Sequence, residues 1–318
     1  SHSAANSEAE TEAAMETRKA MMHEAQIMSY YAHENIILFH GVACDVKPVL
    51  VIMELCPGGD LQTHLTKNGK DMSVQEKILY AFEGASGMAY LHSKNCIHRD
   101  LAARNCLISA HGAIKIADFG LSKITEEVDA KSEKEAKDES NAQLPIRWMA
   151  PESLKKPYTN FTLKSDVWSF GVMVYEIFNN GTKPWPDDDV REIAKNIRRG
   201  QMPKMPESTP SPICDIIAKI WVIDVEKRLK MKDIFCKLMS LYKDDPVADA
   251  SKLTLNKIKD VKRTALFTSD DTETEDSSGL TDNEDRRNRL PRTGRTRTGG
   301  ERRRRSASGR SKNKSMDS

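Results

Sequence analysis

The sequence has no apolar run long enough to cross a lipid bilayer, which needs about 18 residues or more. The longest candidate, residues 167–178 (VWSFGVMVYEIF), is shorter and contains Glu176, so it predicts a buried helix. The N-terminal residues SHSAANSEAETEAAMETRKA are polar and acidic, and this pattern is unlike a signal peptide. We therefore expect no transmembrane segment.

Cysteine is scarce and scattered. The six cysteines stand at positions 44, 56, 96, 106, 214 and 236, without a CxxC pair and without histidines at the spacing of a zinc site. Such thiols are typical of a reducing compartment, which predicts a cytoplasmic protein. We interpret Cys56 and Cys106 as small, buried or half-buried residues and not as nucleophiles.

Aromatic residues are nearly absent after residue 243, where Phe267 is the only one. Residues 270–285 hold eight acids and no base, and residues 286–314 hold thirteen Lys or Arg against one acid. Such a segment cannot offset its ordering entropy by burial, so 244–318 is predicted to be a disordered tail. Its basic part suits an acidic partner, nucleic acid or anionic lipid, and would also allow nuclear localisation; the alternative is a solvated, modifiable segment.

The first 243 residues carry both helical and strand periods. Residues 10–31 predict a helix, and 36–42 and 49–53 predict short strands. Residues 73–92 predict a long helix that opens with a capping box, Ser73-Val74-Gln75-Glu76. The later predictions are a hairpin at 106–108 and 113–116 and helices at 163–179, 188–199, 211–222 and 231–242. A small sheet followed by a mainly helical body predicts an α+β fold.

Residues suited to phosphoryl transfer gather in IHRDLAARNC, residues 97–106. This chemistry needs a carboxylate to orient the attacking hydroxyl and oxygen ligands to hold magnesium on the phosphates. Asp100 is suited to the first role, and Asn105 and Asp118 to the second. HRDLxxxN, Asp118-Phe119-Gly120 and Ala150-Pro151-Glu152 follow in an order and at spacings that hardly arise by chance.

Residues 20–242 resemble the protein kinase catalytic domain, and specifically the tyrosine kinases. Serine/threonine kinases typically have a lysine two residues after the loop aspartate, where this chain has Ala102-Ala103-Arg104. Residues 144–148, LPIRW, match the tyrosine kinase substrate shelf. The stretch HENIILFHGVACDVKPVLVIMELCPGGDL is similar to the cytoplasmic Fes/Fer-like group.

The resemblance implies a protein-kinase-like fold with an incomplete small lobe at 1–55, comprising the family's αC helix and two strands, and a large lobe at 56–243. It implies a protein-tyrosine kinase that uses ATP and Mg²⁺ and acts on tyrosine in protein substrates. It assigns catalytic roles to Asp100, Arg104 and Asn105, and magnesium binding to Asn105 and Asp118. Further residues would contact the nucleotide or its anchor: Glu24, which would pair with the ATP-anchoring lysine, the gatekeeper Met53, the hinge residues Glu54 and Cys56, Leu107 under the adenine, and Asp118.

The resemblance also implies supporting roles. Asp166 would anchor the catalytic loop, and Arg228 would pair with Glu152. A stacked apolar column would contain Met28, Phe39, His98 and Phe119. Read without the family, Glu24 is a solvated helix residue and Asp166 is a helix N-cap.

The chain departs from the family pattern in two places. No GxGxxG turn or VAIK-type lysine is found, and Lys19 cannot face Glu24 because both lie on one predicted helix. We therefore expect a chain truncated before the αC helix, with impaired or absent activity; the alternative is a noncatalytic kinase-like interaction or regulatory module. Residues 121–143 also lack the tyrosine that commonly activates the family. The acids there suggest the hypothesis that unmodified negative charge reaches Arg99, against ordinary solvated loop charge.

Overall fold

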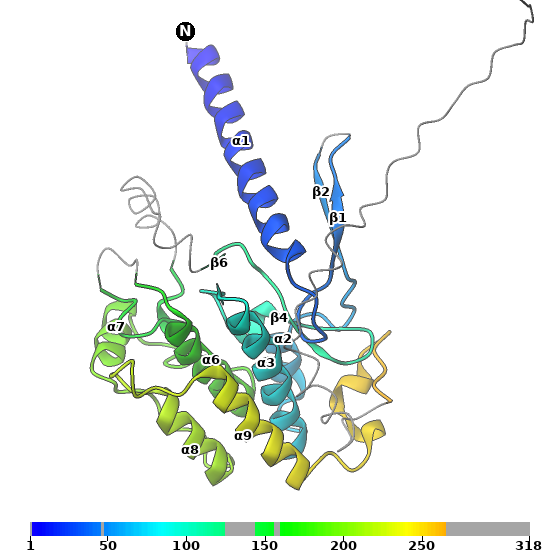
Figure 1. Cartoon of the computed structure of the whole chain (residues 1–318), viewed down its shortest axis with the longest axis vertical. Coiled ribbons are helices and arrows are strands. Elements are labelled where there is room, and N and C mark those ends of the chain that lie inside the picture. The colour runs from blue at the N-terminus through cyan, green and yellow to red at the C-terminus, as the bar shows by residue number, and fades with distance from the viewer. Residues whose placement is uncertain (1, 46–47, 125–143, 156–159, 265–318) are drawn as a thin grey trace, which may run out of the picture. The chain divides into compact units, whose positions relative to one another are not determined.

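A computed structural model describes residues 2–45, 48–124, 144–155 and 160–264 (Figure 1). Every described residue lies within one compact unit. The tyrosine-free segment 125–143 and the predicted tail beyond residue 264 lie outside the described residues.

The N-terminal part consists of a long helix and one two-stranded sheet. Helix α1 spans His2–Ser29, and strands β1 (Phe39–Ala43) and β2 (Leu50–Met53) pair antiparallel. The expected strand began at residue 36, but the backbone of Ile37 donates to Ile116 instead, so residues before 39 join another strand. Ile27 and Met28 at the end of α1 are buried, as expected for this helix.

The remaining elements include every other predicted helix and the predicted hairpin, and add the unpredicted helix α2 and the short strands β3 and β6. They are α2 (Leu61–Asn68), α3 (Val74–Ser93), β3 (Cys96–Ile97), η1 (Ala103–Asn105), β4 (Cys106–Ile108), β5 (Ile114–Ile116), β6 (Lys123–Ile124), η2 (Ile146–Trp148), α6 (Leu163–Phe178), α7 (Val190–Arg198), α8 (Ser211–Ile220), α9 (Met231–Asp244), η3 (Ala250–Lys252) and η4 (Thr254–Lys257). Strands β4 and β5 form the predicted hairpin, and β3 pairs antiparallel with β6.

Helices α3 and α6 form the centre of the core, because most positions on both are apolar or small. From Ser165 to Phe178 every residue of α6 is buried. On α3, Phe82 stacks on two rings of α9, Phe235 and Tyr242, at centroid distances of 5.5 and 5.9 Å. The apolar run that fell short of a membrane span is thus an internal helix, and among the described residues no helix is long and apolar enough to cross a membrane.

The N-terminus of α3 is capped, but only half of the predicted capping box forms. The Ser73 hydroxyl accepts from the Glu76 backbone N–H at 3.1 Å. The Glu76 carboxylate does not return to Ser73, since it accepts from the Tyr80 hydroxyl at 2.6 Å and from Thr254. The second half of the box does not form because Glu76 is buried and accepts hydrogen bonds from a segment that is distant in the sequence.

That distant segment is ordered, although it was predicted to be part of the disordered tail. Residues 245–264 carry the 3₁₀ helices η3 and η4, and Leu253, Leu255 and Val261 are buried in the main core. The predicted start of the disordered tail at 244 was wrong for these residues. Their few apolar positions show no helical or strand period, and their charged partners lie far away in the sequence. For residues 265–318 the expectation of disorder stays a prediction.

A test of the core concerns two glycines of α3. A Cβ on Gly87 would lie 2.6 Å from the carbonyl oxygen of Asn35, whereas a Cβ on Gly84 would meet the flexible end of Met173 at 2.7 Å. Alanine stabilises a helix by about 1 kcal/mol relative to glycine. We expect Gly87→Ala to lower the free energy of unfolding by about 1–3 kcal/mol through overpacking.

Gly84→Ala is the matched control, because a methionine methyl moves at little cost whereas a backbone carbonyl does not. Urea unfolding of both variants measures the difference. Equal effects of the two substitutions would contradict the close approach of α3 to residue 35.

Candidate active site

One buried carboxylate on α6 holds the backbone of the segment 97–105. Asp166, on α6, accepts from the backbone N–H groups of His98 at 2.7 Å and Arg99 at 3.0 Å, and lies 3.2 Å from Nε2 of His92. Thr162 is the N-cap of α6, so the alternative role of Asp166 as a cap is wrong. The predicted anchoring contact is formed, and it holds Arg99 at a positive φ of 72°.

The ring of His98 is occupied by the backbone. Nε2 lies 3.1 Å from the carbonyl oxygen of Ala117, which can only accept, and Nδ1 accepts from the N–H of Asp100 at 3.4 Å. The His98 carbonyl accepts from the Ser122 hydroxyl at 3.1 Å. His98 therefore joins the loop to the segment around Asp118 and is a structural residue, not a base.

Asp100, Arg104 and Asn105 are brought together as a connected group. The Asp100 carboxylate lies 2.5 Å from Nη2 of Arg104 through Oδ1, and its Oδ2 accepts from the Asn105 amide at 2.8 Å. The same amide nitrogen donates to the Asp100 carbonyl at 2.7 Å. Charge-assisted hydrogen bonds of this kind hold a carboxylate in one orientation.

A second buried carboxylate joins this loop to the predicted substrate shelf. Oε2 of Glu176 accepts from the Ala103 N–H at 3.0 Å and from the Trp148 indole N–H at 3.1 Å. The Arg104 guanidinium lies 4.2 Å over the Trp148 ring, a cation–π contact. Arg147, next to it, donates to the carbonyl of Trp185 at 2.8 Å. The loop and the shelf are therefore in direct contact through Glu176 and Arg104.

Glu176 itself is strained electrostatically. Oε1 is buried and accepts no hydrogen bond from a described residue. Burial raises the pKa of Glu176 to about 7, although hydrogen bonds from Ala103 and Trp148 and the charge of Arg104 oppose that shift. Sequence reasoning used Glu176 only as a charge that interrupts an apolar run. A lone glutamate in a buried helix was the signal that could have revealed it.

Asp118 and Glu24 lie near each other at the end of β5. Asp118 is exposed, has a positive φ of 62°, and its Oδ1 accepts from the Gly120 N–H at 3.3 Å. Burial and the Asp118 charge raise the pKa of Glu24, while a hydrogen bond from the Phe119 backbone opposes the shift. Glu24 thus faces Asp118-Phe119 and is not the solvated helix residue of the alternative reading.

Phe119 packs among rings from two segments. It is fully buried, 5.3 Å from the His98 ring in an edge contact and 6.2 Å from the Tyr31 ring in a stacked one. Met28 is buried in the same cluster, and Phe39 packs against it with partial exposure. Met28 and Phe119 therefore share the main core cluster with Phe39 packed against it, and His98 contacts the Phe119 ring. Tyr31 is a neighbour of Phe119 that sequence reasoning missed.

The predicted hinge lies against the β4–β5 hairpin. The Glu54 carboxylate pairs with Lys115 of β5 at 3.1 Å, and the Gly58 N–H donates to the Ile108 carbonyl of β4 at 3.0 Å. Leu107 and Cys56 are half-buried, and Met53 is 46% exposed at the end of β2. These residues are neighbours of the hairpin that ends at Asp118.

The two cysteines near this region are unreactive in character. All six cysteines of the chain are free thiols. Burial raises the pKa of Cys56 to about 11 and raises the pKa of Cys106 further. A thiol with a raised pKa is a poor nucleophile at neutral pH, which agrees with their interpretation as packing residues.

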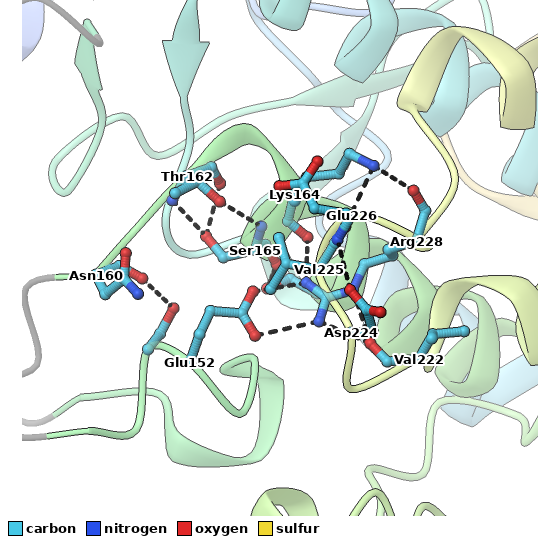
Figure 2. A network of polar contacts seen from close by, with 12 residues as sticks. Glu152, Asn160, Thr162, Lys164, Ser165, Val222, Asp224, Val225, Glu226 and Arg228 are labelled. Atoms are coloured by element: carbon cyan, nitrogen blue, oxygen red, sulfur yellow. Dashed lines mark hydrogen bonds and ion pairs between the residues drawn. The ribbon is translucent and has the colours of Figure 1, made fainter.

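Figure 2 shows the predicted pair of Glu152 and Arg228, which fixes the end of the shelf segment to the loop before α9. The two N–H groups of Arg228 reach the two oxygens of Glu152 at 2.6 and 3.1 Å, with both side chains buried. Arg228 also donates to the carbonyls of Val222 and Lys164. Removing one partner of such a pair is expected to destabilise the fold strongly, because it leaves a buried charge unpaired.

Asn105 and Asp118 present a donor set that suits magnesium. Asn105 uses its amide nitrogen toward Asp100, which leaves its side-chain oxygen for a cation, and the Asp118 carboxylate is exposed. Mg²⁺ is commonly bound by one or two protein oxygens together with waters and phosphate oxygens. Among the described residues no group of three or more His, Cys, Asp or Glu could hold a metal by itself, so phosphate and water oxygens would complete the shell.

Residues 7–238 match the family model described as protein tyrosine and serine/threonine kinase. The chain belongs to this kinase family. The predicted kinase-like fold is thereby confirmed, and the mixed helices and short strands fit it.

Relatives of this kinase domain include several Fer kinases. It is 39% identical over 233 residues to Fer-related kinase 1 of Caenorhabditis elegans, covering 73% of this chain and 57% of that protein. It is 38% identical to tyrosine-protein kinase Fer of Mus musculus, with 72% of this chain and 27% of that protein covered. The NT-3 growth factor receptor of Gallus gallus is 36% identical over 72% of this chain and 29% of its own length. The chain thus spans between a quarter and a little over half of these relatives, and the expected Fer-like character is confirmed.

The raised pKa of Glu176 gives a testable pH dependence. An unfolded glutamate titrates near 4.5 and the folded one near 7, so between these values only the folded state holds the proton. Stability must then fall as pH rises through this window, by at most about 1.4 kcal/mol per pH unit from this group. Glu176→Gln should flatten that slope, while its side-chain oxygen still accepts from Ala103 and Trp148.

Free energies of unfolding from pH 4.5 to 8 for both proteins measure the difference, which cancels contributions of the other acids. Parallel curves would show that Glu176 titrates normally and would contradict its electrostatic strain. Glu192→Gln on the surface of α7 is a suitable control.

Proposed function

We propose that this domain is a protein-tyrosine kinase that transfers the γ-phosphoryl group of ATP to tyrosine in protein substrates. The observation that carries the proposal is the geometry of Asp100, whose carboxylate is oriented by Arg104 and Asn105 on a loop anchored by Asp166. A carboxylate held in this way can accept the proton of a tyrosine hydroxyl as its oxygen attacks phosphorus.

The surrounding residues are proposed to bind the nucleotide and its metal. Asn105 and Asp118 would hold Mg²⁺, which when bound neutralises phosphate charge in the transition state. The backbone of Glu54 to Cys56 would meet the adenine, with Met53 as gatekeeper and Leu107 beneath the ring. The adjacency of hinge and hairpin through Glu54–Lys115 supports this arrangement.

Tyrosine preference rests on the contact of Arg104 with Trp148. In that contact Arg104, which follows Ala102 where serine/threonine kinases typically have a lysine, stacks on the shelf residue Trp148. Glu176 accepts hydrogen bonds from the same ring and from the Ala103 N–H of the loop. The shelf is thereby held at a fixed distance from Asp100. A tyrosine hydroxyl reaches farther than a serine hydroxyl, so a shelf set back from Asp100 favours tyrosine.

One observation favours a second function for the polypeptide of residues 1–318. Glu24 makes no ion pair with any described residue, and Lys115, on the strand before Asp118, pairs with Glu54 instead. Without the ATP-anchoring lysine that Glu24 would hold, the phosphates would be poorly positioned and catalysis would be impaired. We therefore keep a noncatalytic kinase-like interaction or regulatory module as the alternative.

Other sequence-based expectations stay proposals. The free cysteines support a cytoplasmic location. The acidic, nucleic-acid or lipid partners of the basic tail concern residues outside the described part of the chain, as does the hypothesis about acids near Arg99. The boundary between lobes at 55 and 56 also stays a prediction.

The proposed function predicts a specific outcome in a chimera. Residues 1–318 alone should show weak ATP binding and no measurable turnover, whereas a chain preceded by the Gly-rich and VAIK-type strands of a kinase relative should phosphorylate tyrosine peptides. In that chimera Asp100→Asn should lower turnover by at least about a thousandfold and spare ATP binding. Radiolabelled phosphotransfer and nucleotide titration measure both.

Asp224→Asn, an exposed acid that pairs with Lys227 on the surface, is the control. Near wild-type turnover of the Asp100 variant would refute its role as the base. Mainly phosphoserine in a peptide library would refute the tyrosine preference, and robust activity of residues 1–318 alone would refute the impairment.

A further inference from the structure

Residues 246–264, here termed the C-terminal strap, lie beyond the part of the chain that matches the kinase family, which ends at 238. The strap follows α9 and contains η3 and η4, and its apolar residues Leu253, Leu255 and Val261 are buried in the main core. The strap is thus an ordered segment outside the family match, and its contacts show which elements of the domain it packs against.

The strap first contacts the N-terminal half of α3. The N–H and hydroxyl of Thr254 both donate to one oxygen of Glu76, at 2.8 and 2.7 Å. The Thr254 hydroxyl also lies 3.1 Å from Nε2 of His64. Glu76 is 1% exposed and Thr254 is 2% exposed, so this is an internal polar contact and not a surface one.

The strap then contacts α3 two turns farther on. Nη1 of Arg263 lies 2.6 Å from Oε1 of Glu83, with exposures of 6% and 0% for the two side chains. Glu83 is seven residues after Glu76, so both carboxylates point from the same side of the helix. A buried carboxylate without a partner is costly, so the sequence of α3 requires the strap.

The Arg263–Glu83 pair also makes hydrogen bonds to the β4–β5 hairpin. The second oxygen of Glu83 accepts from the Ile114 N–H of β5 at 2.9 Å, and Arg263 donates to the carbonyl of Gly112 in the turn at 3.1 Å. The Lys262 N–H donates to the carbonyl of Ala110 at 2.9 Å. The strap therefore closes over the turn of the hairpin from outside.

This hairpin is the element that carries both proposed magnesium ligands. Asn105 immediately precedes β4, Asp118 follows β5, and the Ala117 N–H donates to the Asn105 carbonyl at 2.9 Å. Because the two strands are only three residues each, little within the hairpin itself fixes its tilt.

We propose that the C-terminal strap is an integral part of the catalytic unit, and that Arg263 is a positioning residue that sets the β4–β5 hairpin and with it Asn105 and Asp118. The role of the hairpin in metal binding rests on the proposed function. The positioning of the hairpin by the strap does not, and it is tested without any measurement of phosphotransfer.

The test is amide hydrogen exchange on residues 1–318 with Arg263→Met, which keeps the length of the side chain and removes its charge. Exchange at Ile114 and Ile116 should accelerate by at least about tenfold, while amides in the middle of α6 change much less. Lys259→Met, at an exposed position of the same strap, is the matched control and should leave the hairpin unchanged.

Thr254→Val is a milder second variant should Arg263→Met fold poorly. It removes one of the two hydrogen bonds that Thr254 donates to Glu76 and should accelerate exchange in the first half of α3 more than in α6. Unchanged exchange in the hairpin of Arg263→Met would overturn the proposal. An equal increase in the hairpin and α6 would overturn it too, because the pair would then set only global stability.

Discussion

The contact between the Asp166 carboxylate and the backbone of His98 and Arg99 is the constraint on which the rest of the site depends. It joins α6, which is buried from Ser165 to Phe178, to a loop of irregular backbone. Such a loop has no internal ladder to hold it, so its geometry must come from outside. Once residues 98 and 99 are fixed, Asp100 projects beyond the core and its orientation needs only Arg104 and Asn105.

Two further carboxylates repeat this design at other points of the structure. Glu176, also on α6, joins the loop to the shelf, and Glu83, on α3, joins the C-terminal strap to the hairpin. Each accepts from a backbone N–H of an irregular or short element and from a side chain of a second one. A buried carboxylate of this kind costs desolvation energy. It also fixes the relative positions of two segments that apolar packing alone would hold less firmly.

Much of the fold was readable from the sequence because its elements are locally coded. The patterns of residues 73–92, of the hairpin at 106–116 and of the helices after 163 each predicted an element that the structure contains. Asp166 and the Glu152–Arg228 pair were found through the family resemblance, and their contacts are formed. Residue roles that need a nucleotide stay predictions.

The strap and the true partner of Glu76 could not be read, for a physical reason. Glu76 and Thr254 are 178 residues apart, and neither pattern nor spacing relates a charge to a partner at that distance. From local patterns, the Glu76 side chain was predicted to bond Ser73 in a capping box, and the strap was predicted to be part of a disordered tail. The usable signal was indirect: Glu76 and Glu83 lie on a helix whose neighbouring positions are mostly apolar, and buried glutamates there require partners from elsewhere in the chain.

The central claim is that α6 holds the catalytic loop through Asp166, and one kinetic measurement tests it most directly. In the active chimera, Asp166→Asn keeps the size of the side chain but replaces one acceptor oxygen with a donor, so only one of the two loop N–H groups stays satisfied. The single-turnover phosphotransfer rate at saturating Mg-ATP should fall by at least about a hundredfold with nucleotide affinity nearly unchanged. An unchanged rate would contradict the claim, because the loop would then hold Asp100 in place without its buried anchor.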